Sequence, residues 1–555
     1  MRTALVAFFM VCSLAADAAP ATAAPGGVRS DSLVAMVRFL TVDASTGAAR
    51  SRFCFRESEI GAVADSLAAR LERYTGGSAD RIPFTIQDHY YTSDSTFTAE
   101  NIVARLSGTG ALPGVFLITA HYDAIALRTD GFRENWSTMP APGADDNASG
   151  VAGLMELARM LPKGALPFDV LFVLFSGEEL GSLGSGDFVA RFDSLYSEDI
   201  LGVINLDMIG YRSAASEENV SDPVLISDYR SGWLTDLVAE SAAGSADMTA
   251  FRIAMPGPSN YDHKPFWLKR IPAITIAESL TENYAISYPL YHTIADTLGD
   301  DLDFEFASSL ANAAGDFLIG LASRGAEIAI LPSDVMLVRD ALITGARAFQ
   351  AGDSLGVLVR VRNIGTQEAP AGASVRLTIT IESEAGERRL FSDNVRVPEP
   401  LRTSDTVVQM MLDRERMGGN IVHVRADVEG MADDSSNDAE DLSFSVSGGG
   451  GVILGHGFRP NPVNGAFGEA SFCVNLAREA DIEISLYTLE GERIVVAHAG
   501  SRWGTDLHAG LNCLSCSSLF GRINKIASGI YIYRVVAIEQ DGSIMRATGR
   551  FAIAH

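Results

Sequence analysis

Four short apolar runs constrain the fold of this chain more than any other feature of its sequence. They occupy residues 115–120, 168–175, 200–206 and 273–276. None of them alternates regularly with polar residues, which is typical of strands buried on both faces of a largely parallel sheet. Apolar residues with helical spacing lie at 151–158 and 306–317. This pattern predicts an α/β domain over about residues 28–324, in which helices flank a mostly parallel mixed sheet.

The remainder of the chain has a different pattern, which is typical of all-β structure. Between residues 331 and 447, apolar and polar residues largely alternate, and turn residues separate the alternating segments. A glycine run at 448–451 predicts a flexible linker, and strand-like segments resume from 452 to 555. We therefore expect two β-sandwich domains, 331–447 and 452–555, after the α/β domain.

The N-terminus carries the pattern of an export signal. Met1 and Arg2 give a positive start, an apolar stretch follows from 4 to 16, and A-x-A cleavage patterns end at residues 18 and 23. We expect residues 1–23 to be a signal peptide, so that the protein is secreted or held at the cell surface. A buried N-terminal helix is the alternative. Since no other stretch approaches about 18 uninterrupted apolar residues, we expect no integral membrane segment in the mature chain.

Composition excludes some classes of partner. The formal net charge of −27 gives a surface that should repel nucleic acid and anionic membranes. A hydrophobic content of 47% describes a globular protein with large cores rather than a disordered one. The acidic stretch from 433 to 441 is expected to be a solvated loop rather than a calcium site.

Four cysteines follow the signal segment, at Cys54, Cys473, Cys513 and Cys516. They are too few to form a disulfide scaffold in a chain of this length. Cys513 and Cys516 form a lone C-x-x-C motif, and a structural zinc site would require a second cysteine pair. We expect a local disulfide or two free thiols there.

Acidic residues and histidines follow the apolar runs, at the edge where α/β sheets bind ligands. Together with an acidic loop and a histidine near the end of the domain, they are His121, Asp123, Asp145, Asp146, Glu178, Glu179, Asp207, His292 and Asp296. Each cluster alone has an ordinary explanation, such as a loop pair or a helix N-cap. A structural interpretation needs five coincidences, whereas one metal site explains them together.

The chemistry of these residues fits zinc, because imidazole and carboxylate are zinc ligands. Two histidines and three carboxylates can hold two zinc ions if one carboxylate bridges them, and the two metals would then share a water or hydroxide. A further carboxylate must take the proton of that water, and adjacent Glu178 and Glu179 can divide the two tasks. We expect Asp123 to accept the other ring N–H of His121, and Asp296 to do the same for His292.

The motifs H-Y-D, G-A-D-D-N-A-S-G, S-G-E-E-L-G-S, N-L-D-M and Y-H-T-x-x-D-T occur in that order. This ordered set resembles metallopeptidase family twenty-eight, which contains leucyl aminopeptidases, glutamate carboxypeptidase and glutaminyl cyclases. The resemblance covers residues 28–324. It implies a zinc exopeptidase fold, metal ligands, a general base, an oxyanion-stabilising tyrosine and a non-proline cis peptide after the bridging aspartate. Carried over by motif, the ligands are His121 and Asp207 for one zinc, Glu179 and His292 for the other, and Asp146 between them, with Glu178 as base and Tyr291 at the oxyanion.

The chain also departs from this family in one motif. Residues 260–263 resemble its S-D-H-x-x-F motif only loosely, because Tyr261 stands where serine is usual. Asp262 and His263 are therefore expected either to line the pocket or to pack in the core. Asp145, which precedes the bridging position, is expected not to be a ligand.

The two β-domains resemble known modules as well. Residues 331–447 are similar to bacterial adhesion-type immunoglobulin-like domains, on the pattern G-x-x-x-x-V-x-V-x-V-x-N-x-G from 352 to 365. Residues 452–555 resemble the sorting and flagellar-hook-type β-sandwiches of secreted bacterial enzymes, on an early N-P, L-E-G at 489–491 and S-G-I-Y at 528–531. This resemblance implies a role in export or cell-surface attachment, or a spacer.

These observations predict a secreted two-zinc metallo-exopeptidase, most simply an aminopeptidase acting on peptide or protein N-termini. A metal-bridging hydroxide would attack the scissile carbonyl, and Glu178 would act as general base. Carboxypeptidase, dipeptidase and glutaminyl cyclase activities on the same fold remain open. A cell-surface binding or adhesion protein is the non-enzymatic alternative, but such a protein would need no general base.

Overall fold

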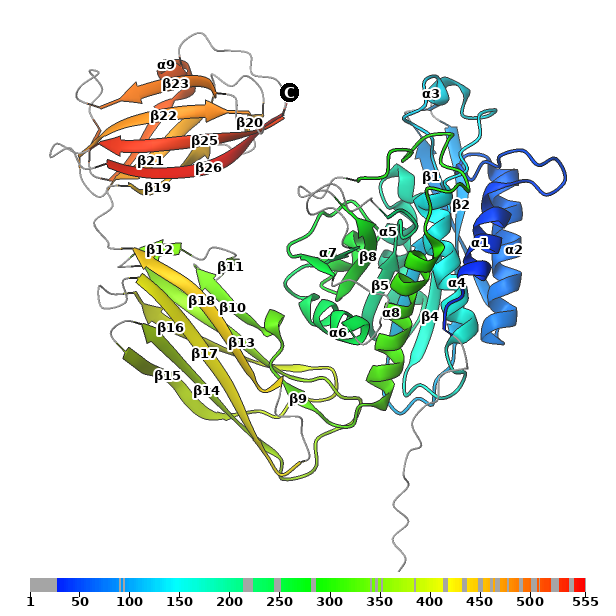
Figure 1. Ribbon diagram of the computed structural model, residues 1–555, viewed down its shortest axis with the longest axis horizontal. Coiled ribbons are helices and arrows are strands. Elements are labelled where there is room, and N and C mark those ends of the chain that lie inside the picture. The colour runs from blue at the N-terminus through cyan, green and yellow to red at the C-terminus, as the bar shows by residue number, and fades with distance from the viewer. Residues whose placement is uncertain are drawn as a thin grey trace, which may run out of the picture.

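The computed structural model describes residues 27–554 except 89–90, 93–94, 213–222, 244–250, 281–285, 340–341, 345–347, 351–352, 384–385, 413–417, 432–436, 448–452, 460–462, 465–469, 477–478, 489–492, 501–506, 509, 521–528 and 539–543. Three units follow one another along the chain, an α/β unit and two all-β units (Figure 1). The predicted signal peptide and the glycine run lie outside the described residues.

The α/β unit is built on an eight-stranded mixed sheet with the order β1-β2-β4-β3-β5-β8-β6-β7. Its strands are β1 (Ala79–Asp88), β2 (Ser95–Leu106), β3 (Val115–His121), β4 (Asp169–Phe175), β5 (Ile200–Leu206), β6 (Pro223–Ile226), β7 (Arg252–Ala254) and β8 (Ala273–Ser279). The central strands β4, β3, β5 and β8 are parallel to one another. They coincide with the four apolar runs, so the predicted strands and their parallel arrangement are confirmed.

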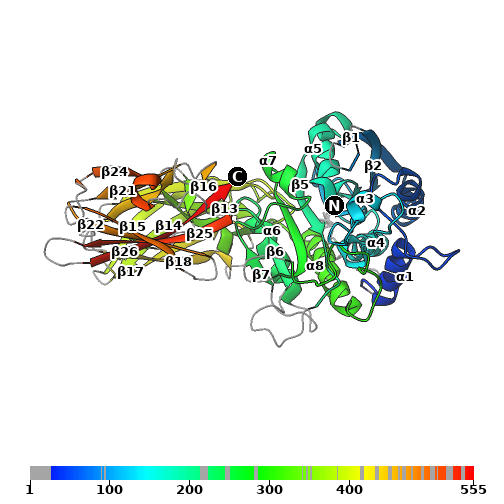
Figure 2. The same cartoon turned by 90° about the horizontal axis from the view of Figure 1, so that it is seen from above.

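Helices cover both faces of this sheet (Figures 1 and 2). One face packs against the apolar side chains of α1 (Ser30–Thr41), α2 (Glu57–Thr75), α4 (Gly150–Met160), α6 (Gly232–Ala243) and α8 (Phe304–Ser323). The opposite face packs against α5 (Leu183–Leu195) and α7 (Lys264–Leu268), through residues such as Phe188 and Phe266. The short helix α3 (Phe132–Asn135) lies in the loop between β3 and α4. Since both faces are covered, the central strands need no polar side, which explains their continuous apolar sequence.

The register of the central strands places the polar residues that follow them side by side. His121, the last residue of β3, lies opposite Phe175, the last residue of β4. Thr119 lies opposite Asn205 of β5, so Asp207 follows level with His121. The side chains that follow the three strands therefore converge at one edge of the sheet.

The second unit is a sandwich of two five-stranded sheets. One sheet contains β9 (Ile328–Ala329), β10 (Val335–Arg339), β11 (Leu342–Thr344), β13 (Ser354–Asn363) and β16 (Thr403–Met411). The other contains β12 (Ala348–Gln350), β14 (Ser374–Ser383), β15 (Gly386–Val395), β17 (Gly418–Glu429) and β18 (Ala439–Ser447). The predicted alternating segments lie within β13, β14 and β17, as expected for strands with one face in a core.

The sandwich is packed on the α/β unit rather than connected to it only by the chain. Leu331, Ile364 and Leu401 of the sandwich belong to the same apolar cluster as α8. Arg362 donates two hydrogen bonds to Asp334, at 3.1 and 2.8 Å, and its guanidinium carbon lies 5.2 Å from the ring centre of Trp233 in α6. Both charged side chains of this pair are buried.

The third unit has two sheets and a core of its own. Its elements are β19 (Ile453–Arg459), β20 (Val463–Asn464), β21 (Ser471–Leu476), β22 (Asp481–Tyr487), β23 (Arg493–Ala499), β24 (Gly510–Ser515), β25 (Gly529–Ile538), β26 (Ile544–Ala554) and the short helix α9 (Cys516–Phe520).

The cysteines of this unit correct a prediction. Cys473 of β21 forms a disulfide with Cys513 of β24, and Cys516 is a buried free thiol. Cys513 and Cys516 therefore form neither a disulfide with each other nor a pair of free thiols. The physical reason is strand pairing, because Cys473 and Cys513 lie directly opposite each other in the antiparallel ladder. Such a register cannot be read from cysteine spacing alone.

Among the helices within the described part of the chain, none combines the length and apolar character needed to cross a membrane.

The buried ion pair Asp334–Arg362 gives a test of how the sandwich is stabilised. Asp334→Ala leaves the Arg362 guanidinium buried without its partner, and we expect the free energy of unfolding in urea to fall by about 3–5 kcal/mol. The control is Glu399→Ala, which removes the exposed pair Arg396–Glu399 and should change stability by less than about 1 kcal/mol. Equal effects of the two substitutions would contradict this account.

Candidate metal centre

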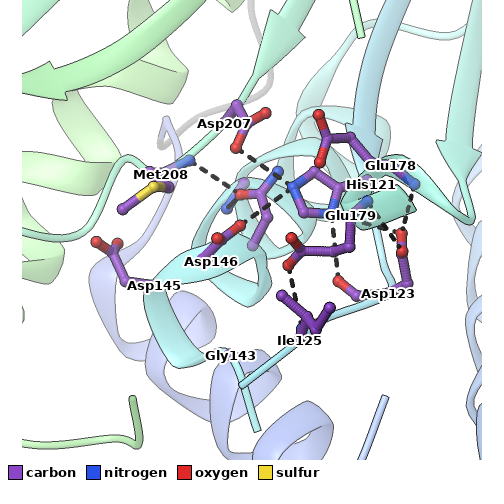
Figure 3. A network of polar contacts seen from close by, with 12 residues as sticks. His121, Asp123, Ile125, Gly143, Asp145, Asp146, Glu178, Glu179, Asp207 and Met208 are labelled. Atoms are coloured by element: carbon purple, nitrogen blue, oxygen red, sulfur yellow. Dashed lines mark hydrogen bonds and ion pairs between the residues drawn. The ribbon is translucent and has the colours of Figure 1, made fainter. Parts of the chain in front are cut away.

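His121, Asp146 and Asp207 form the first part of a buried polar cluster at the convergent strand ends (Figure 3). His121 ends β3, and its Nε2 lies 3.2 Å from Oδ1 of Asp146 and 3.4 Å from Oδ1 of Asp207. All three side chains are almost inaccessible to solvent. Three groups that are zinc donors in other proteins thus face one another in a water-excluded site.

His292 and Glu179 form the second part of the cluster. His292 Nε2 lies 2.8 Å from Oε2 of Glu179 and 3.1 Å from Oδ2 of Asp146. The carboxylate of Asp146 therefore divides its oxygens, with Oδ1 toward His121 and Oδ2 toward His292. One ligand atom each from His121, Asp146 and Glu179 lies within a common 4.8 Å. The structure brings together all five residues that the sequence predicts as metal ligands.

The loop that carries Asp146 is fixed by backbone geometry and by a buried carboxylate. Gly143 begins the turn with φ +56, and a Cβ there would meet the Asp146 carbonyl oxygen at 2.0 Å, so only glycine fits. The backbone N–H groups of Asp145 and Asp146 donate to the two oxygens of Asp296, at 2.9 and 3.2 Å. The peptide bond between Asp146 and Asn147 is cis, as the family resemblance predicts.

Asp296 thus has a different role from the one expected. Its carboxylate accepts from the Asp145–Asp146 backbone and from the hydroxyl of Tyr288, at 3.2 Å, and no hydrogen bond from His292 is among its described contacts. The prediction that Asp296 orients His292 is therefore wrong. His292 stands in the left-handed region, with φ 58, and the chain between residues 292 and 296 turns Asp296 toward the aspartate loop.

Asp123 lies beside His121, as predicted, but the nearest acceptor is its backbone. Nδ1 of His121 lies 3.2 Å from the Asp123 carbonyl oxygen and 3.6 Å from its Oδ1. The Asp123 carboxylate instead accepts from the backbone N–H groups of Glu178 and Glu179, at 3.2 and 3.3 Å. Asp123 therefore connects the loop after β3 to the loop after β4, and it positions both glutamates as well as the imidazole.

The adjacent glutamates point to different neighbours. Glu179 directs Oε2 toward His292, and its Oε1 accepts from the N–H of Ile125 at 3.1 Å. Glu178 makes no ion pair with a histidine among the described residues. Burial raises the pKa of its carboxyl well above the usual range. Glu178 thus lies next to the histidine–carboxylate cluster without being part of its closest contacts.

The electrostatics of the cluster fit a divalent cation. Burial opposes protonation of His292, but the carboxylates of Glu179 and Asp146 raise its pKa to about 10. Burial also lowers the pKa of His121, yet Asp207, Asp123 and Asp146 together raise it well above the usual range. Nε2 of His292 is buried and makes no well-directed hydrogen bond. Imidazole nitrogens surrounded by carboxylate oxygens favour a cation at this position, and this donor set fits zinc.

Tyr291 and Asp145 flank the cluster. The ring of Tyr291 stacks on His292 with centroids 3.7 Å apart, and the Arg128 guanidinium carbon lies 4.6 Å from its centre. Burial and the nearby carboxylates raise the pKa of Tyr291, so its hydroxyl remains protonated and can donate. Its role at an oxyanion stays a prediction. Asp145 is directed away from His121 (Figure 3), and its Oδ1 accepts from Gly210 N at 2.8 Å.

His263 has a packing role, which was one of the two possibilities expected for residues 262 and 263. His263 has both ring nitrogens at hydrogen-bonding distance from buried oxygens, 2.7 Å from Thr275 Oγ1 and 3.0 Å from Pro258 O. Burial lowers the pKa of His263 to about 3, so the ring is neutral. Asp262 accepts from the hydroxyl of Ser185 at 2.6 Å.

Arg52 is a residue of the site that the sequence did not reveal. It is completely buried and donates to the carbonyl oxygens of Tyr122 (2.8 Å), Pro142 and Gly143 (2.9 Å). It therefore connects the His121 loop to the Asp146 loop. Burial lowers its pKa to about 10, which still leaves a positive charge near the acidic cluster. The sequence gives only a weak hint, an arginine within the aromatic segment R-F-C-F.

Comparisons with known proteins agree with this geometry. Residues 101–314 match the model of peptidase family M28. The chain is 30% identical over 236 residues to a protein of Leptosphaeria maculans named "probable zinc metalloprotease", covering 42% of this chain and 51% of the relative. It is 28% identical over 237 residues to leucine aminopeptidase 1 of Ajellomyces capsulatus, covering 41% and 58%. The chain thus spans about half the length of these curated relatives.

A solved structure of the LapA aminopeptidase of Legionella pneumophila aligns with 53% of this chain and 72% of its own. Its sequence identity is 23%, and the TM-score is 0.41.

Arg52 offers a test of how the two loops are held. Arg52→Met removes the three donors and a buried positive charge, and we expect zinc affinity to fall about 10–100-fold, measured by competition with a chromogenic chelator. The control is Arg50→Met, because the Arg50 side chain lies 3.9 Å from Asp43, away from the Asp146 loop, and should leave zinc affinity unchanged. Unchanged affinity in Arg52→Met would show that the loops do not need this residue.

Proposed function

We propose that this protein is a zinc metallo-exopeptidase, most simply an aminopeptidase that uses two zinc ions. The observation that carries the proposal is the division of the Asp146 carboxylate, with one oxygen toward His121 and the other toward His292. A carboxylate shared in this way between two imidazole–carboxylate groups suits a two-metal site. The M28 match and the names of the relatives support the same conclusion.

The residues divide into two donor groups. His121 and Asp207 would hold one zinc, His292 and Glu179 would hold the other, and Asp146 would contact both. When bound, zinc polarises a carbonyl oxygen and lowers the pKa of water, which supplies the electrophilic part of peptide hydrolysis.

Glu178 would move the proton. It follows β4 directly, and its backbone is fixed by the Asp123 carboxylate, which also lies beside His121. A carboxylate placed beside the metal ligands, and not among their closest contacts, can accept a proton from water and return it to the leaving amine. Tyr291 would donate from its protonated hydroxyl to the oxyanion.

A cavity of about 430 Å³ beside Glu179 supports a large apolar residue at the cleaved end. Its lining includes the apolar side chains of Phe55, Ile86, Leu180 and Leu183. Among the described lining residues there is no lysine or arginine, whereas Asp88 and Glu179 are acidic. The described lining thus offers no basic partner for a substrate carboxylate, which supports an aminopeptidase rather than a carboxypeptidase.

We also propose that the protein acts outside the cell, exported by residues 1–23. Its partners would be the N-termini of peptides or proteins. The C-terminal unit would attach the enzyme to a cell surface or serve as a spacer.

The two glutamates can be separated by matched substitutions. Glu178→Gln should reduce kcat by about 10²–10⁴-fold, because it removes the general base, while zinc content stays unchanged. Glu179→Gln should instead reduce zinc content, since Glu179 faces His292. Kinetics and metal analysis of the same preparations check both outcomes, and full activity in Glu178→Gln would remove its assigned role.

A panel of chromogenic substrates tests the activity itself. We expect release from aminoacyl substrates with large apolar residues, loss of activity with a chelator, and recovery with zinc. Hydrolysis only of substrates with a free C-terminal carboxylate would favour a carboxypeptidase. Cyclisation of N-terminal glutamine would favour a glutaminyl cyclase. No turnover of any substrate by the zinc-loaded protein would favour a binding protein.

The apolar cavity predicts the side-chain preference. Leu183→Glu places a carboxylate in the cavity, and we expect kcat/KM for a leucyl substrate to fall about 10–200-fold relative to an alanyl substrate. Leu195→Glu is the control, because Leu195 ends the same helix and is similarly exposed, 43% against 38% for Leu183, and does not line the cavity. An equal loss for both substrates in Leu183→Glu would contradict the proposed pocket.

A further inference from the structure

A second cavity, of about 300 Å³, lies at the junction of the α/β unit and the sandwich. Helix α6 is the helix of the α/β unit that lies nearest this junction in both views (Figures 1 and 2). The apolar lining includes Trp233 of α6 and Pro272, which precedes β8. Five arginines also line it, from both units: Arg230, Arg270, Arg360, Arg362 and Arg402.

The arginines of this cavity are not fully neutralised. Arg362 is paired with Asp334, Arg360 lies 3.5 Å from Asp405, and Arg402 lies 3.0 Å from Asp199. The side chains of Arg230 and Arg270 form no ion pair with any residue that the structure describes. Five guanidinium groups thus face three carboxylates, and two positive charges remain.

This concentration of positive charge contrasts with the acidic composition of the chain. The chain carries 70 acidic and 43 basic residues, with a net charge of −27. Guanidinium groups that line one cavity repel each other, and a bound anion would reduce this repulsion. The guanidinium fork matches the oxygens of phosphate in a bidentate manner, which makes arginine the preferred residue for such ligands.

The shape of the cavity limits the size of the anion. Its volume is at the lower end of the range for small-molecule sites, about 300–1,000 Å³. An adjoining cavity shares Ile200, Arg270, Pro272 and Arg402, and the charged residues that its lining adds are three acidic ones and one basic one, Asp193, Glu198, Asp199 and Lys269. The positive region therefore ends within the groove, and a long polyanion would meet negative charge there.

We propose that this cavity, lined by Arg230, Arg270, Arg360, Arg362 and Arg402, binds a small phosphate-bearing ligand that contacts both units at once. The ligand is either a free inorganic phosphate or a phosphate ester whose organic group lies on Pro272. Ile200 lines the cavity and begins β5, whereas Asp207 follows the other end of that strand. At about 3.3 Å per residue the site is roughly 20 Å from the metal centre, so it is separate from the proposed peptidase site.

Titration calorimetry at constant ionic strength tests this proposal on the full chain. We expect saturable binding of pyrophosphate or phenyl phosphate by the unmodified protein. The double variant Arg230→Ala/Arg270→Ala should bind at least about tenfold more weakly, because it loses two charge-assisted contacts. Tighter binding of phenyl phosphate than of inorganic phosphate would identify an ester, and the reverse order would identify a free phosphate.

The matched control is Arg376→Ala/Arg388→Ala. Both arginines are exposed on the other sheet of the sandwich, and the control changes the net charge by the same amount. It should bind as the unmodified protein does. Absence of binding in the unmodified protein, equal binding by the Arg230/Arg270 variant, or an equal loss in the control would each overturn the proposal. So would succinate binding as tightly as pyrophosphate. Aminoacyl-substrate hydrolysis, measured in parallel, should stay unchanged in both variants.

Discussion

The carboxylate of Asp146, shared between two imidazole–carboxylate groups, is the interaction on which the rest of the α/β unit depends. The proposed metal centre draws five side chains from five separate segments, and among them only Asp146 contacts both groups. Parallel pairing of β3, β4 and β5 brings three of these segments to one edge. The remaining requirement is to hold the Asp146 loop, and Gly143, Asp296 and Arg52 all serve it.

Burying so many carboxylates is costly, and the structure lowers that cost in two ways. Asp296 and Asp123 accept hydrogen bonds from backbone N–H groups of the ligand loops, so they position the ligands while their own oxygens are satisfied. Arg52 adds a buried positive charge that bonds to backbone carbonyls. Because no single carboxylate neutralises it, this charge stabilises several carboxylates of the cluster at once.

Much of this arrangement was predictable from the sequence, and the limits of the prediction have physical causes. The apolar runs predicted β3, β4, β5 and β8 because strands buried on both faces need continuous apolar sequence. The convergence of His121, Glu179 and Asp207 was predictable because polar residues at the ends of such strands lie at one edge of the sheet, whereas Asp146 and His292 were assigned from the family motifs. The roles of Asp296 and Arg52 could not be predicted. Asp296 accepts hydrogen bonds from backbone N–H groups and Arg52 donates to backbone carbonyl groups, and such contacts leave no recognisable spacing in the sequence. The Cys473–Cys513 disulfide was missed for a related reason, since strand register decides it.

The central claim is that Asp146 serves two metal ions, and zinc stoichiometry tests it most directly. Metal analysis would be done on the purified, zinc-saturated protein and on two variants. Asp207→Asn changes one donor group, whereas Asp146→Asn changes the carboxylate between the two groups. The account predicts about two zinc ions per chain for the unmodified protein, about one for Asp207→Asn, and a loss at both positions for Asp146→Asn. One zinc ion in the unmodified protein, unchanged by Asp207→Asn, would contradict it.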